Sequence, residues 1–119
     1  MLDDDTRYRL FRLLADHPRI SQRELAMALG LSLGKTNYSV RALVERGWIK
    51  VQNFRNSDNK LAYAYVLTPT GATAKVRATV DFLRRKQGDF VRLEQEIEQL
   101  RREVAIAEQE QESTSSHST

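Results

Sequence analysis

One segment of the sequence, about residues 33–46, gathers side chains that could read the edges of nucleic-acid bases. At 100° per residue in a helix, one face of its N-terminal half presents amide, phenol and cationic groups. Arginine and lysine donate to guanine O6 and N7, asparagine pairs with adenine, and tyrosine bonds a phosphate or packs on a thymine methyl group. These residues are Lys35, Asn37, Tyr38 and Arg41. The opposite, inward face consists of Thr36, Ser39, Val40, Leu43 and Val44.

The start of this predicted helix favours close approach to a polyanion. Ser32 is placed as the N-cap, and Gly34 has no side chain that would hold a partner away. Unpaired backbone N–H groups in a first helical turn also suit a phosphate. The candidate contact set is therefore Ser32, Gly34, Lys35, Asn37, Tyr38 and Arg41. A helix surface that meets only solvent is the alternative interpretation.

Two further helices are predicted before this one. Periodic apolar residues predict a helix over residues 5–16. A capping box, Ser21 followed by Glu24, opens the next helix, and Gly30 ends it. The short connection Gly30-Leu31-Ser32 then leads into the third helix, which is the pattern of a helix-turn-helix motif.

Two β-prone segments follow, at residues 48–51 and 61–67, with a polar and turn-rich segment between them. They predict a hairpin, and a hairpin directly after a helix-turn-helix indicates a winged helix. At its tip, Arg55, Asn56 and Lys60 are the candidate contacts for a minor groove or flanking phosphates. Basic residues on a turn can also be merely solvated.

A long helix is predicted after the hairpin, with Thr68 as its N-cap and Pro69 as its first residue. Its first part carries a broad apolar face suited to packing on the preceding elements. That face consists of Val76, Val80, Phe82 and Leu83.

From about residue 90 the same helix has the heptad pattern of a coiled coil. The residues expected in the dimer contact are Leu83, Phe90, Leu93, Ile97, Leu100 and Val104. These residues form the apolar seam of the predicted coiled coil. A lone helix folded back on the domain is the alternative, but little surface is left there to cover it. The charged residues beside the seam are compatible with both parallel and antiparallel pairing.

These elements predict a mainly α fold with a small β-hairpin, namely a winged helix-turn-helix followed by a long C-terminal dimerisation helix in a coiled coil. The expected divisions are residues 1–69 for the winged DNA-binding domain, 70–112 for the dimerisation helix and 113–119 for a disordered, Ser/Thr-rich tail.

Charge is distributed unevenly along the 119 residues. Residues 1–87 hold 16 Lys and Arg against 8 Asp and Glu, a net +8, whereas residues 88–119 hold 3 against 8, a net −5. A basic body suits a polyanion, although a solvated surface is the alternative, and the acidic C-terminal segment suggests a separate task.

The composition excludes several other classes of protein. The chain has no cysteine and only two histidines, so we expect no metal site and no thiol or histidine-triad chemistry. Without a nucleophile–base pair or a phosphate loop, we expect no enzyme activity and no cofactor. No apolar run approaches the length of a membrane span, and the acidic N-terminus is not a signal peptide. We therefore expect a cytoplasmic protein that does not associate with membranes.

In these features the chain resembles the MarR family of winged-helix transcriptional regulators. The resemblance covers about residues 7–87 and rests on SQRELA at 21–26, LS at 31–32, V-x-x-L-x-x-x-G-W-I at 40–49 and LTPTG at 67–71. More narrowly, residues 32–38 and 47–54 resemble the EPS-associated subgroup, whose members are implicated in exopolysaccharide biosynthesis loci. The resemblance implies a homodimer that binds double-stranded DNA.

Two departures from the family pattern matter. The wing tip reads Asp58-Asn59-Lys60 where family wings often carry Asp-x-Arg, and lysine is a point charge rather than a fork. Larger members also build a ligand pocket from helices at both ends of the chain. With a single long helix after Gly71, we expect no such pocket and doubt a small-molecule effector here.

The leading hypothesis is a dimeric, sequence-specific DNA-binding transcriptional regulator acting on a pseudo-palindromic operator. The resemblance adds exopolysaccharide genes as its targets. The alternative is a protein-interaction module, in which the winged helix is a scaffold and the coiled coil recruits a partner.

Overall fold

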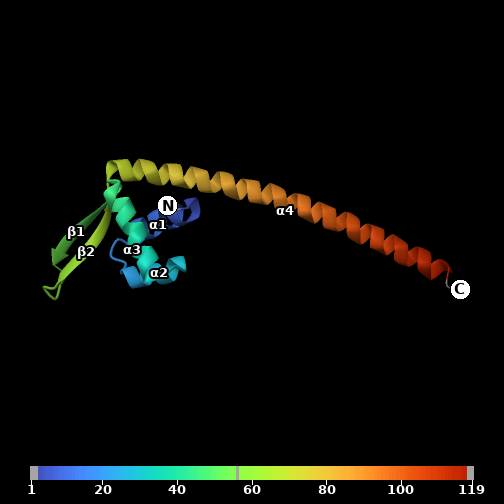
Figure 1. Cartoon of the computed structure of the whole chain (residues 1–119), viewed down its shortest axis with the longest axis horizontal. Helices are drawn as coiled ribbons and strands as arrows, with labels where there is room; N and C mark the ends of the chain where they lie inside the picture. Colours follow the sequence, from blue (N-terminus) through green and yellow to red (C-terminus); the bar gives the residue numbers. More distant parts are fainter. Residues whose placement is uncertain (1–2, 56, 118–119) are drawn as a thin grey trace. The chain divides into compact units, whose positions relative to one another are not determined.

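The computed structural model describes residues 3–55 and 57–117. Within them, three short helices precede a hairpin and a long helix (Figure 1). The elements are α1 (Asp4–Asp16), α2 (Gln22–Leu29), α3 (Leu33–Glu45), β1 (Ile49–Arg55), β2 (Leu61–Leu67) and α4 (Pro69–His117). The fold prediction of a winged helix-turn-helix followed by a long helix is confirmed. The chain forms two compact units, Met1–Phe82 and Leu83–Thr119, and the boundary between them falls inside α4.

Side-chain caps and one glycine determine the helix-turn-helix. Ser21 Oγ accepts a hydrogen bond from Glu24 N at 3.1 Å, and Ser32 Oγ accepts one from Lys35 N at 3.1 Å. Gly30 ends α2 at φ 68°, a left-handed conformation that disfavours any side chain. The turn expected from Gly30 to Ser32 is therefore the observed one.

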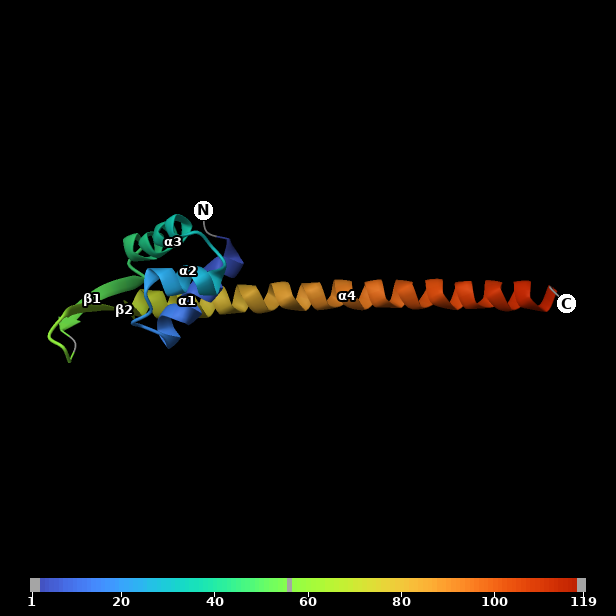
Figure 2. The same ribbon diagram turned by 90° about the horizontal axis from the view of Figure 1, so that it is seen from below.

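One hydrophobic core joins the three short helices, the root of the hairpin and the start of α4. Figure 2 shows these elements grouped together. Its members are at most 5% exposed. They are Leu10, Phe11, Leu14, Leu25, Leu29, Val40, Leu43, Ile49, Tyr65 and Ala78. Full burial of a Leu, Ile, Val or Phe side chain contributes about 1.5–3 kcal/mol. Since every element contributes to this core, α3 cannot rotate about its axis without opening it.

The inner face of α3 is the predicted one, except for Val44. Its buried residues are Thr36, Ser39, Val40 and Leu43. The buried hydroxyls donate one turn back, from Thr36 to Ser32 O and from Ser39 to Lys35 O, both at 2.8 Å. Neither polar group is therefore buried without a partner. Val44 is instead 37% exposed, because it lies at the edge of this face beside a groove described below.

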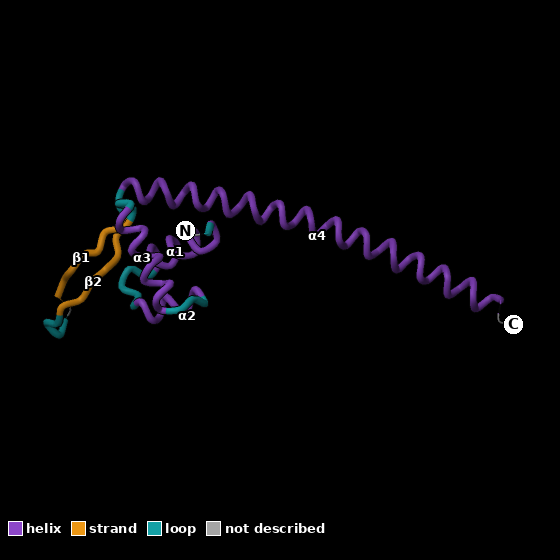
Figure 3. The backbone as a smooth tube through the Cα atoms, viewed as in Figure 1, coloured by secondary structure: helices purple, strands orange, loops and turns teal. Residues whose placement is uncertain are grey.

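The hairpin is longer than predicted (Figure 3). Its strands pair antiparallel from Ile49↔Leu67 to Arg55↔Leu61, so β1 reaches Arg55 rather than ending at residue 51. The polar residues 52–53 stay in the strand because backbone hydrogen bonds supply the pairing, whatever the side chains.

The chain enters and leaves the hairpin through one tight junction. Thr68 N donates to Trp48 O at 3.1 Å. Thr68 Oγ1 accepts from Gly71 N at 2.9 Å, which confirms the predicted N-cap of α4. Gly71 packs so closely here that an added Cβ would lie 1.8 Å from Trp48 O. The junction therefore requires the absence of a side chain at residue 71.

The first part of α4 packs inward with Phe82, as predicted, but not with the other three residues of the predicted face. The inward residues are Gly71, Ala74, Ala78 and Phe82. Phe82 stacks on Tyr8 of α1, with ring centroids 4.1 Å apart. The residues Val76, Val80 and Leu83 are 64%, 40% and 55% exposed, so the prediction that they pack inward is wrong. Small side chains occupy the inward positions because they let the backbone of α4 approach the core closely.

The second unit, Leu83–Thr119, is a helix in which most of the described residues are exposed. The seam residues in it from Phe90 to Val104 are between 41% and 60% exposed. The helix continues to His117, whereas the sequence predicts disorder from residue 113. In its last turns the Thr114 hydroxyl donates to Glu110 O at 2.9 Å.

Replacing Gly71 by alanine should destabilise the protein, although alanine is the better helix former. The new Cβ would collide with the Trp48 carbonyl, and overpacking of this kind costs about 1–3 kcal/mol. Gly88→Ala is the matched control, because its nearest neighbour is Arg92 Nη1 at 3.9 Å and helix propensity alone should then favour alanine by about 1 kcal/mol. Thermal unfolding followed by circular dichroism measures both. A Gly71→Ala protein as stable as the parent would contradict the junction.

Candidate nucleic-acid interface

The outer face of α3 presents most of the predicted reading residues. Gly34, Lys35, Tyr38 and Arg41 are exposed, Tyr38 at 60%. Ser32 stands at the N-cap with its hydroxyl bound to Lys35 N. The buried inner face fixes this orientation, so the structure brings these five residues together on one surface.

Asn37 differs from its neighbours because it is half-buried and tied to α2. Its Nδ2 donates to Gln22 Oε1 at 3.0 Å. One donor of Asn37 is therefore used inside the protein, while Oδ1 keeps its capacity to accept. Gln22 is absent from the predicted set. It stands inside the capping box, where nothing in the sequence distinguishes it from an ordinary helix-surface glutamine.

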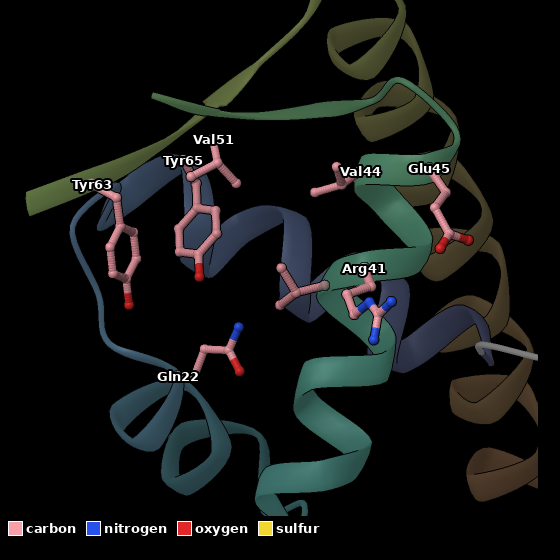
Figure 4. A pocket seen from close by; sticks show the side chains of 8 residues that line it. Gln22, Arg41, Val44, Glu45, Val51, Tyr63 and Tyr65 are labelled. Carbon is pink, nitrogen blue, oxygen red and sulfur yellow. The ribbon is translucent and has the colours of Figure 1, made fainter. Parts of the chain in front are cut away.

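An open groove of about 500 Å³ lies between α3, the hairpin and the start of α2 (Figure 4). Its lining residues are Gln22, Val40, Arg41, Val44, Glu45, Val51, Tyr63 and Tyr65. Figure 4 shows the Gln22 amide on the side of the tyrosines, with Arg41 and Glu45 across from it on α3. Because Arg41 belongs to both surfaces, the groove and the reading face of α3 form one continuous candidate interface.

Tyr65 ties the hairpin to the helices. It is 5% exposed, and burial raises the pKa of its phenol, an effect that a hydrogen bond from the Gln22 side chain opposes. Its backbone N donates to Pro18 O at 2.8 Å, and Tyr63 packs edge-on against its ring at 5.4 Å between centroids. The root of the hairpin therefore has a defined place beside α2 and α3.

The wing tip contains two of the three predicted contact residues within the described ranges. Arg55 Nη1 donates to Asn59 O at 3.1 Å, which folds the guanidinium over the tip. Lys60 is exposed. Asn56 lies outside the described residues. The tip thus presents at least one lysine and one arginine, and Asn59 adopts φ 60° between them.

Further cations, absent from the predicted set, are held over aromatic rings, among them Arg7 at 5.8 Å from the centroid of the Trp48 ring. The Arg19 guanidinium lies 4.4 Å from the centroid of the Phe54 ring on β1, and that of Arg46 lies 5.0 Å from Trp48. Such contacts hold a cation in place at the surface without neutralising it. Arg19 lies in the irregular segment between α1 and α2, where no periodicity could reveal it.

The structure offers no metal centre in the ranges it describes. No three or more His, Cys, Asp or Glu side chains there are grouped as metal ligands. Nor does any helix in these ranges have the length and apolar character needed to cross a bilayer.

Comparison with protein families matches residues 3–50 to a family described as winged helix-turn-helix DNA-binding. The match covers α1, α2 and α3 together with the entry into the hairpin. Comparison with curated proteins gave no match.

Solved structures of similar fold include regulators from two bacteria. MarR of Staphylococcus aureus, solved with salicylate and kanamycin, is 19% identical at a TM-score of 0.53, over 72% of this chain and 56% of that one. The adhesin competence repressor AdcR of Streptococcus pyogenes is 19% identical at 0.55, over 77% and 66%. MepR, a transcription regulator of the Staphylococcus aureus multidrug efflux pump MepA, is 20% identical at 0.54, over 87% and 76%.

The match to this chain thus spans less than two thirds of the first two of these proteins. At such identities the likeness concerns the fold, and it agrees with the family match. The protein therefore contains a winged helix-turn-helix domain of the DNA-binding type, in a fold that it shares with solved MarR-family regulators.

Proposed function

We propose that this protein is a sequence-specific transcriptional regulator that binds double-stranded DNA through α3 and the hairpin. The observation that carries the proposal is the outer face of α3, where Lys35, Tyr38 and Arg41 are exposed while the inner face is locked into the core. A helix held from behind in this way can enter a major groove without losing its packing.

The exposed residues divide into two kinds of contact. Lys35 and Arg41 donate to guanine, and Tyr38 bonds a phosphate or packs on thymine, so α3 supplies the reading of sequence. Arg55 and Lys60 at the tip of the hairpin contact the backbone or the adjoining minor groove, which fixes the register of the domain on the duplex.

The proposal includes a homodimer that binds a pseudo-palindromic operator. Its support is the seven-residue spacing of apolar side chains from Val76 to Val104 on α4, which a single chain leaves in water. Two-fold pairing sets two reading helices on half-sites about one helical turn apart, roughly 34 Å. The resemblance to EPS-associated regulators extends the proposal to promoters of exopolysaccharide genes.

Selection of bound duplexes from a random DNA pool, with the protein mass measured in the same buffer, tests the proposal. We expect an enriched inverted repeat, with half-sites about 10 bp apart, bound by a dimer. A dimer that enriches no sequence would contradict DNA reading and favour a scaffold that recruits another protein.

Substitutions on α3 and at the wing tip should have different effects on DNA affinity. Arg41→Ala should weaken binding to the best sequence by about 1–3 kcal/mol and relax preference at one base of each half-site. Lys60→Ala should weaken binding to all sequences about evenly and lower the salt slope by about 1 per subunit. Competition binding at several salt concentrations measures both effects.

Arg12→Ala is the control for these two variants. It removes one positive charge from α1, where Arg12 pairs with the exposed Asp16, and should leave base preference unchanged. Uniform losses over all sequences for Arg41→Ala as well as Lys60→Ala would contradict the division of contacts.

An aspartate at the centre of the seam should disrupt the dimer. Ile97→Asp places a charge among apolar residues that pair in the proposed coiled coil, so sedimentation should detect monomers and weaker operator binding. Gln99→Asp adds the same charge about 200° away around α4 and should leave the dimer intact. Equal dimer masses for both variants would refute the seam.

A further inference from the structure

Gln22 lies between α3 and the hairpin, and the proposed function does not yet include it. It is the first residue of α2 and lies beside the groove, between α3 and β2 (Figure 4). Its Oε1 accepts from Asn37 Nδ2 at 3.0 Å, and Tyr65 lines the same groove. Gln22 and Asn37 are both half-buried, so water competes only in part for their hydrogen bond.

The hydrogen bond to Gln22 favours one of the two ways in which the carboxamide of Asn37 can face. An asparagine carries a donor and an acceptor that exchange places when the amide turns over. Gln22 Oε1 can only accept, so it holds Nδ2 of Asn37 toward itself. Tyr65, which lies with Gln22 along the groove, is 5% exposed and donates its backbone N–H to Pro18 O. The hydrogen bond to α2 thus favours one orientation of the Asn37 carboxamide.

We propose that Gln22 is a positioning residue for base reading, which holds Asn37 with Oδ1 available to accept a hydrogen bond. A base that meets Oδ1 of Asn37 must then offer an exocyclic amine in the major groove, and adenine N6 and cytosine N4 are the groups that do so. This inference rests on the proposed DNA binding and deepens it, because it names a specificity-determining residue outside α3.

Base selection by variants of the full-length protein tests the inference. The parent should prefer adenine or cytosine at one position of each half-site, and Gln22→Ala should reduce that preference about fivefold, the worth of one net hydrogen bond. Preference at the position read by Arg41 should not change. Because Gln22 acts through Asn37, the double variant Gln22→Ala/Asn37→Ala should lose no more preference than Asn37→Ala alone.

Two matched variants separate positioning from a general loss of binding. Gln22→Glu keeps an acceptor for Asn37 Nδ2, so it should retain the base preference even where its negative charge weakens overall affinity. Arg23→Ala changes the next residue of α2, whose side chain is exposed, and should lower affinity at most evenly over all sequences. A loss of the base preference in Arg23→Ala equal to that in Gln22→Ala would overturn the positioning role.

A measurement without DNA distinguishes this inference from the proposed function. In the free protein, Gln22→Ala should shift the Asn37 side-chain amide signals in a ¹⁵N NMR spectrum and speed their hydrogen exchange, whereas Arg23→Ala should not. Unchanged Asn37 signals, or an unchanged base preference in Gln22→Ala beside an intact preference at the Arg41 position, would overturn the inference alone. A parent protein that enriches no sequence would overturn both.

Discussion

The contact between Gly71 and the carbonyl of Trp48 is the constraint on which the winged domain depends. At this point α3 has just ended, the hairpin both begins and closes, and α4 starts. Gly47 turns the chain at φ 73°, Trp48 N donates back to Leu43 O at 3.0 Å, and Thr68 returns to bond the same tryptophan carbonyl. A Cβ at residue 71 would displace α4 from this turn and, with it, the place where both strands are anchored.

The two faces of α3 carry separate requirements. The inner face is set by burial, because its apolar groups lie in the core and its two hydroxyls are satisfied within the helix. The outer face contributes little to folding, so folding places few requirements on the identity of its residues. Asn37 stands on the border between the faces, where its side chain donates a hydrogen bond to Gln22 of α2.

Much of the fold could be predicted because local chemistry and tertiary structure agree. The capping serines, the left-handed Gly30 and the Thr68-Pro69 start of α4 all have short-range physical reasons that a sequence displays. The outer face of α3 could be predicted too, since the periodicity that defines the buried face also defines the exposed one.

The remaining features depend on contacts between distant residues. Hydrophobic periodicity favoured Val76 and Val80 as the packing face of α4, yet Ala74 and Ala78 pack inward because close approach selects small side chains over large ones. The hydrogen bond from Asn37 to Gln22 joins residues on two helices and has no local signature. β1 likewise extends to Arg55 because it pairs with β2, and its own polar residues do not predict a strand there.

Because the apolar seam of α4 is exposed in a single chain, the cellular concentration of the protein would determine how much of it is paired. Where pairing is coupled to DNA binding, dimer formation follows mass action, and its free energy adds to that of binding. At concentrations below the dissociation constant of the dimer, occupancy of an operator by the proposed homodimer rises with the square of the protein concentration. A modest change in synthesis or degradation would then produce a disproportionate change in occupancy. Self-association through the apolar residues of α4 would in this way make the response of an operator to protein concentration steeper.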